Sequence, residues 1–222
     1  MITVCLCSSR AIINGKAVED VTNMLRNVGY EVQQVDDLCQ IAMNSHEKMA
    51  AMANHTVIAC YPRAVNALFD RFNLKPKQVL NLRKDSVKEV LKSFNIAYDG
   101  DNKDVTSFAL AKHAGRDAWY PALDRERCIQ CGKCHDFCLF GVYTLENGEV
   151  RVTNPANCKT DCPACARTCP VKAVIFPKYP KSPINGGLDD EETANGQGAL
   201  YNDALRMRLN QRRLSGISLL KK

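Results

Sequence analysis

The sequence lacks the segments that would place it in or across a membrane. It contains no run of about 18 apolar residues, which a membrane-spanning helix requires. Its first residues, MITVCLCSSR, include neither the basic stretch nor the apolar stretch of a secretory signal. No G-x-G-x-x-G sequence follows a predicted strand, so no flavin or nicotinamide site is recognisable. We therefore expect a cytoplasmic protein with no membrane span and no organic redox cofactor.

What the sequence has in excess is sulfur, with 12 cysteines in 222 residues. In a reducing cytoplasm, closely spaced cysteines are typical of metal ligands or redox groups rather than of a disulfide framework. Cysteine chemistry is therefore the first candidate for the function of this chain.

Strand and helix patterns alternate through residues 1–98. The apolar or β-branched segments ITVCLC, YEVQQV, HTVIAC and KQVLNL are typical of strands, and helical patterns separate them. Gly29 and Pro62 stand where one helix should end and another should begin. This alternation predicts βαβ units, and so a small doubly wound α/β domain with a parallel sheet.

Three further segments follow this domain. Residues 99–122 predict a helical connector that ends in Trp119 and Tyr120, which we expect to pack one domain on the other. Residues 123–178 contain eight cysteines. Residues 179–222 predict an extended arm without a core of its own, ending in a basic helix with six Lys or Arg residues and one Asp.

The eight cysteines form two runs of four. CIQCGKCHDFC has the pattern C-x2-C-x2-C-x3-C, and CKTDCPACARTC has the pattern C-x3-C-x2-C-x3-C. Thiolates this close in sequence reach adjacent irons of one cluster if the loop curls over it. A zinc ribbon usually places its cysteines in two separated C-x2-C knuckles. The runs favour iron and sulfide, with zinc as the alternative.

Residues 123–178 resemble the bacterial two-cluster [4Fe–4S] ferredoxins. The segments VYTL and VRV, on either side of Asn147-Gly148, fit the hairpin between the runs, and VKAVIF fits its pseudo-symmetric counterpart. The resemblance implies an α+β domain in which the fourth cysteine of each run ligates the other cluster. One cluster would then take Cys128, Cys131, Cys134 and Cys169, and the other Cys158, Cys162, Cys165 and Cys138.

Two features depart from the pattern of that family. Leu139 follows Cys138 where the family usually has proline. The second run opens with three residues between its first two cysteines instead of two. The extra residue is expected to change the shape of the loop without preventing cluster assembly.

Four cysteines remain outside the runs. Cys5 and Cys7 are expected on one face of the first strand, Cys39 just after the second strand, and Cys60 at the end of the third. All four then lie at the carboxyl edge of the sheet, where open α/β sheets bind ligands. We expect a third [4Fe–4S] cluster there. The alternatives are four buried hydrophobic residues, a redox-active dithiol or disulfide, and a single zinc ion.

The first domain carries a second resemblance. CLCSSR, a cysteine after the second strand, and VIACYPR resemble the amino-terminal domain of the heterodisulfide reductase A subunit over residues 1–75. The resemblance favours the third cluster. The large flavin-binding portion of that subunit has no counterpart in this sequence.

Clusters with four cysteine ligands keep no open metal position for a substrate, so we expect electron transfer rather than catalysis by this chain. The expected role is an iron–sulfur subunit of anaerobic metabolism that passes low-potential electrons to or from a larger catalytic oxidoreductase, bound through the arm. By resemblance, that partner is a heterodisulfide-reductase-like flavoprotein or a tungsten or molybdenum enzyme of the aldehyde:ferredoxin type, including reductases of aromatic acyl thioesters. A soluble ferredoxin or a flavoprotein is the expected electron donor.

Two other functions remain open. One is a cluster-dependent regulatory or binding protein, and the other is a dithiol redox enzyme that uses the four cysteines outside the runs. We expect no nucleic-acid binding, because the basic tail has one aromatic residue, Tyr201, and stacking on bases needs several.

Overall fold

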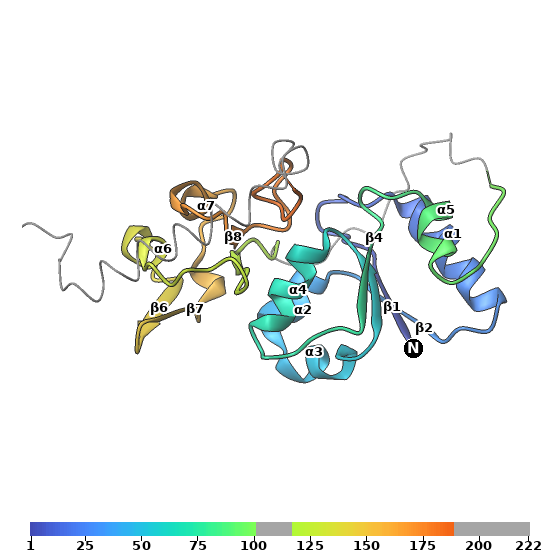
Figure 1. Ribbon diagram of the computed structural model, residues 1–222, viewed down its shortest axis with the longest axis horizontal. Coiled ribbons are helices and arrows are strands. Elements are labelled where there is room, and N and C mark those ends of the chain that lie inside the picture. The colour runs from blue at the N-terminus through green and yellow to red at the C-terminus, as the bar shows by residue number, and fades with distance from the viewer. Residues whose placement is uncertain (101–116, 189–222) are drawn as a thin grey trace, which may run out of the picture.

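A parallel sheet organises the first half of the computed structural model, which describes residues 1–100 and 117–188 (Figure 1). The strands of this sheet are β1 (Ile2–Cys5), β2 (Val32–Val35), β3 (Thr56–Ala59) and β4 (Gln78–Asn81). They lie in the order β2-β1-β3-β4, and every neighbouring pair is parallel. The predicted α/β fold is confirmed for this half.

Helices cover both faces of the sheet (Figure 1). On one face α1 (Gly15–Asn27) packs against α5 (Val87–Lys92). On the other face lie α2 (Leu38–Asn44), α3 (His46–Met52) and α4 (Pro62–Asp70). This is the doubly wound arrangement that the alternation of strands and helices predicted.

Capping side chains set where the helices begin. Asn14 accepts hydrogen bonds from two backbone N–H groups in the first turn of α1. Asp37 and Ser45 cap α2 and α3 in the same way, so the chain after β2 forms two short helices. The pattern of residues 44–54, NSHEKMAAMAN, predicts a single polar helix in this region. Gly29, with a φ of 93°, follows α1, and Pro62 begins α4, as expected.

Residues 117–188 contain two small antiparallel sheets and three short helical segments. In the sheets, β5 (Ala122–Leu123) pairs with β8 (Val174–Ile175), and β6 (Tyr143–Glu146) pairs with β7 (Glu149–Val152). The helical segments are α6 (Lys133–Phe137), α7 (Ala164–Thr168) and the 3-10 helix η1 (Pro155–Asn157). None of the helices within the described residues is long and apolar enough to cross a membrane.

The turn between β6 and β7 confirms the hairpin expected from Asn147-Gly148. Asn147 has a φ of 51° and Gly148 a φ of 78°. A two-residue turn of this kind needs positive φ at both positions, which asparagine and glycine adopt most readily.

An aromatic pair joins the two halves of the chain, as the sequence predicted. The ring of Trp119 stacks on Phe176 with centroids 5.3 Å apart, and the guanidinium of Arg10 lies 4.4 Å from the Trp119 ring centre. The hydroxyl of Tyr120 donates a hydrogen bond of 2.7 Å to the carbonyl oxygen of Cys39. The connector helix expected within residues 99–122 falls mostly outside the described residues.

Two arginines of the first half add hydrogen bonds across this junction. Arg63 donates to Asp124 Oδ2 at 2.9 Å and to the carbonyl oxygen of Lys172 at 2.8 Å. Arg83 donates to the carbonyl oxygens of Pro177 and Tyr179, each at 3.0 Å. Both arginines therefore hold backbone that follows the second cysteine run.

The first ten residues of the segment predicted as an arm are packed. Residues 179–188 pack on the first half instead of extending: Asn185 is 1% exposed, and a Cβ on Gly186 would lie 2.9 Å from Cβ of Ala64. The arm boundary at residue 179 is therefore wrong, because Arg83 and α4 provide partners for this backbone. The basic helix, within 189–222, lies outside the described residues.

Candidate metal centres

The four cysteines outside the runs lie together at the carboxyl edge of the parallel sheet. Cys5 ends β1, Cys60 directly follows β3, and Cys39 is the second residue of α2, just after β2. Cys7 lies two residues beyond β1. All four are buried, and the most accessible of them, Cys60, is 7% exposed. Three strand ends therefore bring four thiols to one edge.

Two details of this placement differ from the sequence prediction. Cys7 is not on the strand, since β1 ends at Cys5 and Cys7 has a φ of 50°. The alternation of side chains along a strand therefore does not orient it. Cys39 lies just after β2, as expected, but it belongs to a helix, because the carboxylate of Asp37 caps α2 directly before it.

Burial and mutual repulsion keep these thiols protonated. Burial raises the pKa of Cys5 to about 12 and that of Cys60 to about 11, and it raises the pKa values of Cys7 and Cys39 as well. The charge of Cys60 raises the pKa of each of the other three further, which places the four thiols within electrostatic reach of one another. Burial likewise raises the pKa values of Cys128, Cys134 and Cys165 in the two runs.

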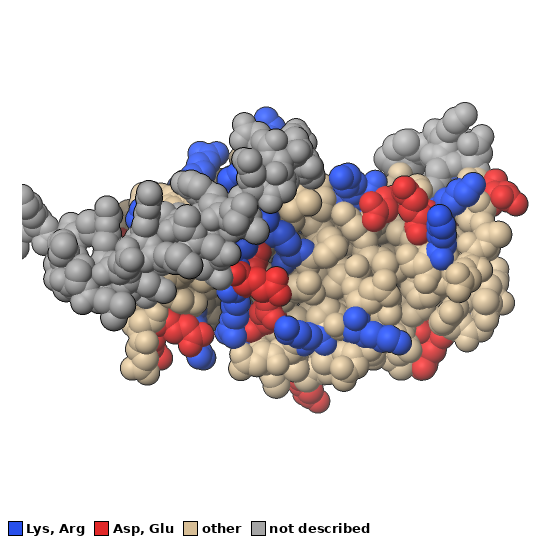
Figure 2. Space-filling model, in the orientation of Figure 1, with Lys and Arg blue, Asp and Glu red and all other residues tan. Residues whose placement is uncertain are grey.

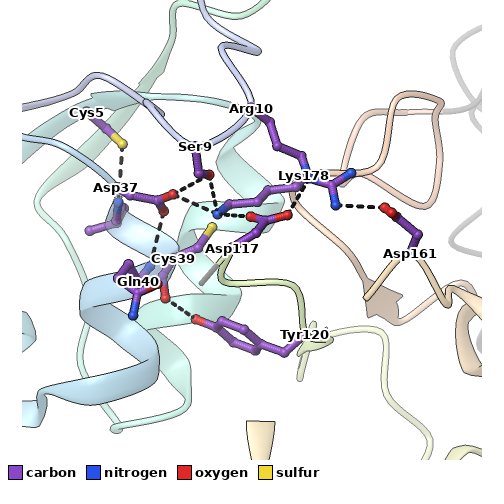
Figure 3. A network of polar contacts seen from close by, with 11 residues as sticks. Cys5, Ser9, Arg10, Asp37, Cys39, Gln40, Asp117, Tyr120, Asp161 and Lys178 are labelled. Atoms are coloured by element: carbon purple, nitrogen blue, oxygen red, sulfur yellow. Dashed lines mark hydrogen bonds and ion pairs between the residues drawn. The ribbon is translucent and has the colours of Figure 1, made fainter. Parts of the chain in front are cut away.

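A buried lysine from the second half lies beside this group (Figure 3). The side chain of Lys178 is 1% exposed. Its Nζ donates to Ser9 Oγ at 2.6 Å, to Asp37 Oδ2 at 2.7 Å and to Asp117 Oδ1 at 2.8 Å. Burial disfavours the ammonium, but the nearby Cys39 and Asp37, with hydrogen bonds to both carboxylates, raise the pKa of Lys178 to about 12. Lys178 is therefore charged at neutral pH.

The two four-cysteine runs have matching local structures. Helix α6 carries Cys134, the third cysteine of the first run, and ends at Cys138, the fourth. Helix α7 carries Cys165 and ends at Cys169 in the same way. The two helices pack against each other, so both runs meet at one place.

Residues with left-handed backbone curl the loops before these helices. Gln130 and Gly132 have φ values of 55° and 78° in the first loop, and Asp161 has a φ of 62° in the second. Asp161 is the last of the three residues between Cys158 and Cys162, where the run departs from the ferredoxin pattern. Its Oδ1 accepts a hydrogen bond of 2.7 Å from Arg10 Nη2. The longer loop therefore contacts the first half of the chain.

The fourth cysteine of each run lies close to the other run. Burial raises the pKa of Cys128 to about 11, and Cys169, from the second run, has the largest effect among the cysteines that raise it further. Burial also raises the pKa of Cys165 to about 11, and Cys138, from the first run, is the foremost cysteine acting on it. The runs are therefore interleaved rather than separate.

Hydrogen-bond donors point at several of the sulfur atoms. The N–H of Leu38 donates to Cys5 Sγ at 3.4 Å, the N–H of Ala173 donates to Cys169 Sγ at 3.2 Å, and the hydroxyl of Tyr143 donates to Cys165 Sγ at 3.1 Å. Such donors favour the thiolate over the thiol and are among the groups that set cluster potentials. Sequence reasoning missed Tyr143 and Lys178, since neither belongs to a cysteine motif.

The donor atoms gathered at these sites are thiol sulfurs. All 12 cysteines lie in the described residues, and none forms a disulfide. Within residues 1–100 and 117–188, no three His, Cys, Asp or Glu side chains converge closely enough to hold one metal ion. Zinc needs four ligands converging on one ion, with sulfur at about 2.3 Å. A four-iron cluster takes one thiolate at each iron, so its ligands are spread more widely.

Curated proteins similar to this chain carry the name ferredoxin. The uncharacterized ferredoxin MJ0251 of Methanocaldococcus jannaschii is 38% identical over 94 residues, which are 42% of this chain and 54% of that protein. The chain thus spans about half the length of this relative. The uncharacterized ferredoxin MJ0722 of the same organism is 39% identical over 57 residues, 24% of this chain and 73% of the relative.

A third similar protein is Ferredoxin-3 of Nostoc sp., which is 33% identical over 78 residues, 25% of this chain and 79% of the relative. No protein-family model matches the chain. No solved structure matches it either.

Proposed function

The chain belongs to the ferredoxin family, and we propose that it is an electron-transfer subunit with three [4Fe–4S] clusters that serves a larger catalytic oxidoreductase. Membership in this family accounts for electron transfer through iron–sulfur clusters. The observation that carries the proposal beyond a two-cluster ferredoxin is the third group of four buried cysteines, at the carboxyl edge of the parallel sheet.

The second half would hold two clusters with ligands exchanged between the runs. The interleaving of the runs and the packing of α6 against α7 support this exchange. The two ligand sets are Cys128, Cys131, Cys134 and Cys169 for one cluster and Cys158, Cys162, Cys165 and Cys138 for the other.

The first half would hold the third cluster through Cys5, Cys7, Cys39 and Cys60. Their number equals the number of irons in one cluster, and the N–H of Leu38 provides a donor to one of the sulfurs. Four buried thiols that served only as hydrophobic residues would not need to gather from two strand ends and a helix start. The resemblance of residues 1–75 to heterodisulfide reductase A stays a prediction.

When bound, these clusters supply one-electron transfer and no substrate site, because each has four protein ligands. The residues of the chain hold the thiolates at fixed positions, exclude water from the sulfurs and donate hydrogen bonds to them. Loops curled by Gln130, Gly132 and Asp161 bring the cysteines of each run inward. The chain therefore relays electrons to and from partners at its surface.

Replacing Tyr143 with phenylalanine should lower the reduction potential of the cluster at Cys165. The lost hydroxyl donates to Cys165 Sγ at 3.1 Å, and donors to sulfur stabilise the extra negative charge of the reduced cluster. The free energy of unfolding should fall by about 1 kcal/mol, as for the loss of one buried hydrogen bond. A potentiometric titration followed by electron paramagnetic resonance measures the potential. In the control Tyr30→Phe, at a 40% exposed ring, the potential should not move. Equal potentials in both variants would show that the hydroxyl has no such role.

An apolar surface next to Cys138 is where we place the exit of electrons to the catalytic subunit. Leu139 is 93% exposed, and its neighbours Phe137 and Phe140 are 51% and 44% exposed. Electron transfer needs close approach to a cluster ligand, and exposed apolar groups of this size are typical of contact surfaces. Leu139 stands where the ferredoxin pattern has proline, so this departure adds apolar surface beside a cysteine.

We place the binding of the same subunit in residues 189–222, and a shortened chain tests this. A tagged full-length chain recovered anaerobically from its native source should bring down a catalytic oxidoreductase subunit, and addition of that enzyme's substrate should change the reduction state of the clusters. A chain that ends at Leu188 should keep its iron, because deletion of residues 189–222 leaves the described core intact. It should, however, recover much less of the partner. Loss of iron from the shortened chain, or equal recovery of the partner by both chains, would contradict the proposal.

The charge distribution gives no support to the regulatory alternative. On the face shown in Figure 2, the basic and acidic side chains of the described residues are intermixed rather than gathered by sign. A nucleic-acid surface gathers lysine and arginine along one face. The basic tail that raised this alternative lies outside the described residues.

A further inference from the structure

We propose that Lys178 and Asp37 are the pair of opposite charges that sets the reduction potential of the cluster held by Cys5, Cys7, Cys39 and Cys60. The inference rests on the proposed third cluster, and it assigns a role to residues that ligate nothing. Lys178 would favour the reduced cluster and Asp37 the oxidised one.

The burial of Lys178 is the first observation behind this assignment. Its side chain is 1% exposed and that of Asp37 is 2% exposed. Lysine is almost never fully buried unless it is paired, because removing its charge from water is costly. Lys178 has three partners within hydrogen-bond distance, so it is held charged at one defined position (Figure 3).

The position of the ammonium relative to the cysteines is the second observation. The ammonium of Lys178 donates to Ser9, two residues after Cys7, and to Asp37, two residues before Cys39. Figure 3 shows the Lys178 side chain reaching into the space between Asp37, Asp117 and Cys39. A fixed positive charge therefore lies beside Cys39.

Asp37 exerts the opposite influence from the same network. It directly precedes Leu38, whose N–H donates to Cys5 Sγ at 3.4 Å, and it lies two residues before Cys39. Asp37 also caps α2, through the N–H of Gln40 at 3.1 Å. An iron–sulfur cluster with four thiolate ligands is negatively charged and gains one more negative charge on reduction. In a buried site of low dielectric constant, both neighbouring charges act strongly on that step.

The origin of Lys178 gives this arrangement a consequence for the whole chain. Lys178 follows β8, nine residues after the last cysteine of the second run, whereas Asp37 lies 141 residues earlier. The second half therefore supplies a positive charge at the cysteine site of the first half, beside that of Arg83, which lowers the pKa of Cys60 against the larger rise caused by burial. Arg10 extends the connection, since it pairs with Asp117 at 2.6 Å and with Asp161 of the second run at 2.7 Å.

The test compares two variants of the full-length protein, one that removes the positive charge of Lys178 and one that removes the negative charge of Asp37. Lys178→Met keeps the approximate length of the side chain and removes its charge. It should lower the equilibrium constant for reduction of the cluster about tenfold, which is a downward shift of about 59 mV in the reduction potential for one electron. Asp37→Asn keeps a capping side chain and removes a negative charge, so it should shift the potential upward. An anaerobic potentiometric titration followed by electron paramagnetic resonance gives both values. The signal of this cluster is the one that Cys60→Ser protein lacks.

A matched control separates local charge from total charge. Lys77→Met makes the same change in net charge at an exposed lysine just before β4, at the edge of the sheet opposite to the cysteines. Its potential should equal that of the unmodified chain. Lys178→Arg retains the charge, so its reduction potential should lie close to that of the unmodified chain, without most of the shift caused by Lys178→Met. A purely structural role for Lys178 would move the potentials of Lys178→Met and Asp37→Asn in the same direction.

Each outcome decides the matter. Opposite shifts in the two variants, absent from the control, support the assignment. Shifts of the same sign, or equal shifts in Lys178→Met and Lys77→Met, overturn it and leave the three-cluster function standing, provided iron content is unchanged. If Lys178→Met does not fold, Asp37→Asn is sufficient as a test: an unchanged or lowered reduction potential in that variant overturns the assignment. Unmodified protein with about eight irons per chain contradicts the proposed function and this inference together.

Discussion

Replacing Cys60 with serine should lower the iron content by about four atoms per chain and leave the two ferredoxin clusters in place. Cys60 directly follows β3 and is one of the four thiols at the carboxyl edge of the sheet. If these thiols hold one cluster, loss of one ligand removes all of its iron, whereas the ligands in residues 128–169 are untouched. Iron analysis of anaerobically prepared protein measures the difference.

The neighbouring variant Ala59→Ser is the matched control for Cys60→Ser. It also places a hydroxyl in the core, since Ala59 is 2% exposed, but it removes no thiol and should keep all the iron. If the four cysteines are only hydrophobic residues, Cys60→Ser costs roughly 1–3 kcal/mol of stability and the iron stays constant. If they form a dithiol site, the iron also stays constant and thiol reagents find reactive groups in the native protein. Either result leaves a two-cluster ferredoxin with an unexplained α/β domain.

Removal of all iron should unfold residues 123–178 while the parallel sheet persists. A segment of ~50 residues buries too little apolar surface to be stable alone and must draw on metal ligation. The strands β5 and β8 have two residues each, and α6 and α7 have five each, so the secondary structure here is short. The first half has a core of its own, in which Val4, Ile58 and Leu68 are at most 1% exposed.

Hydrogen–deuterium exchange resolved by segment distinguishes these two halves. After anaerobic chelation, amides in residues 143–152 should exchange at the rate of an unfolded chain, whereas those of β1 and β3 stay protected. Reconstitution with iron and sulfide should restore protection, which controls for irreversible damage. Residues 123–178 that remain protected after complete loss of iron would show that metal does not hold this half together.

The fold of the first half could be predicted because local signals and tertiary structure agree. Strand patterns alternate with helical patterns, and residues such as Gly29 and Pro62 mark the boundaries that the structure has. The hairpin at Asn147-Gly148 was predictable for the same reason, since its turn geometry needs these residue types. A single capping residue, Asp37, sets the start of α2, and the pattern did not show that Cys39, expected just after the second strand, begins a helix.

The cysteines of the candidate sites could be found from spacing, but the residues around them could not. Lys178 meets Asp37 and Asp117 from positions 141 and 61 residues away, and no sequence motif connects the three. Residues 179–188 lack apolar periodicity and were predicted to extend, yet Arg83 provides donors for their carbonyl oxygens. Such contacts depend on how the two halves meet, which the local sequence pattern does not contain.

The number of clusters is tested most directly by iron and acid-labile sulfide in the unmodified, full-length protein. The chain should be purified without oxygen, and its concentration should be determined by quantitative amino-acid analysis. Three [4Fe–4S] clusters predict about 12 iron and about 12 sulfide per chain, without stoichiometric zinc. About eight of each would leave the thiols of Cys5, Cys7, Cys39 and Cys60 without a cluster, and zinc in place of iron would contradict the cluster assignment altogether.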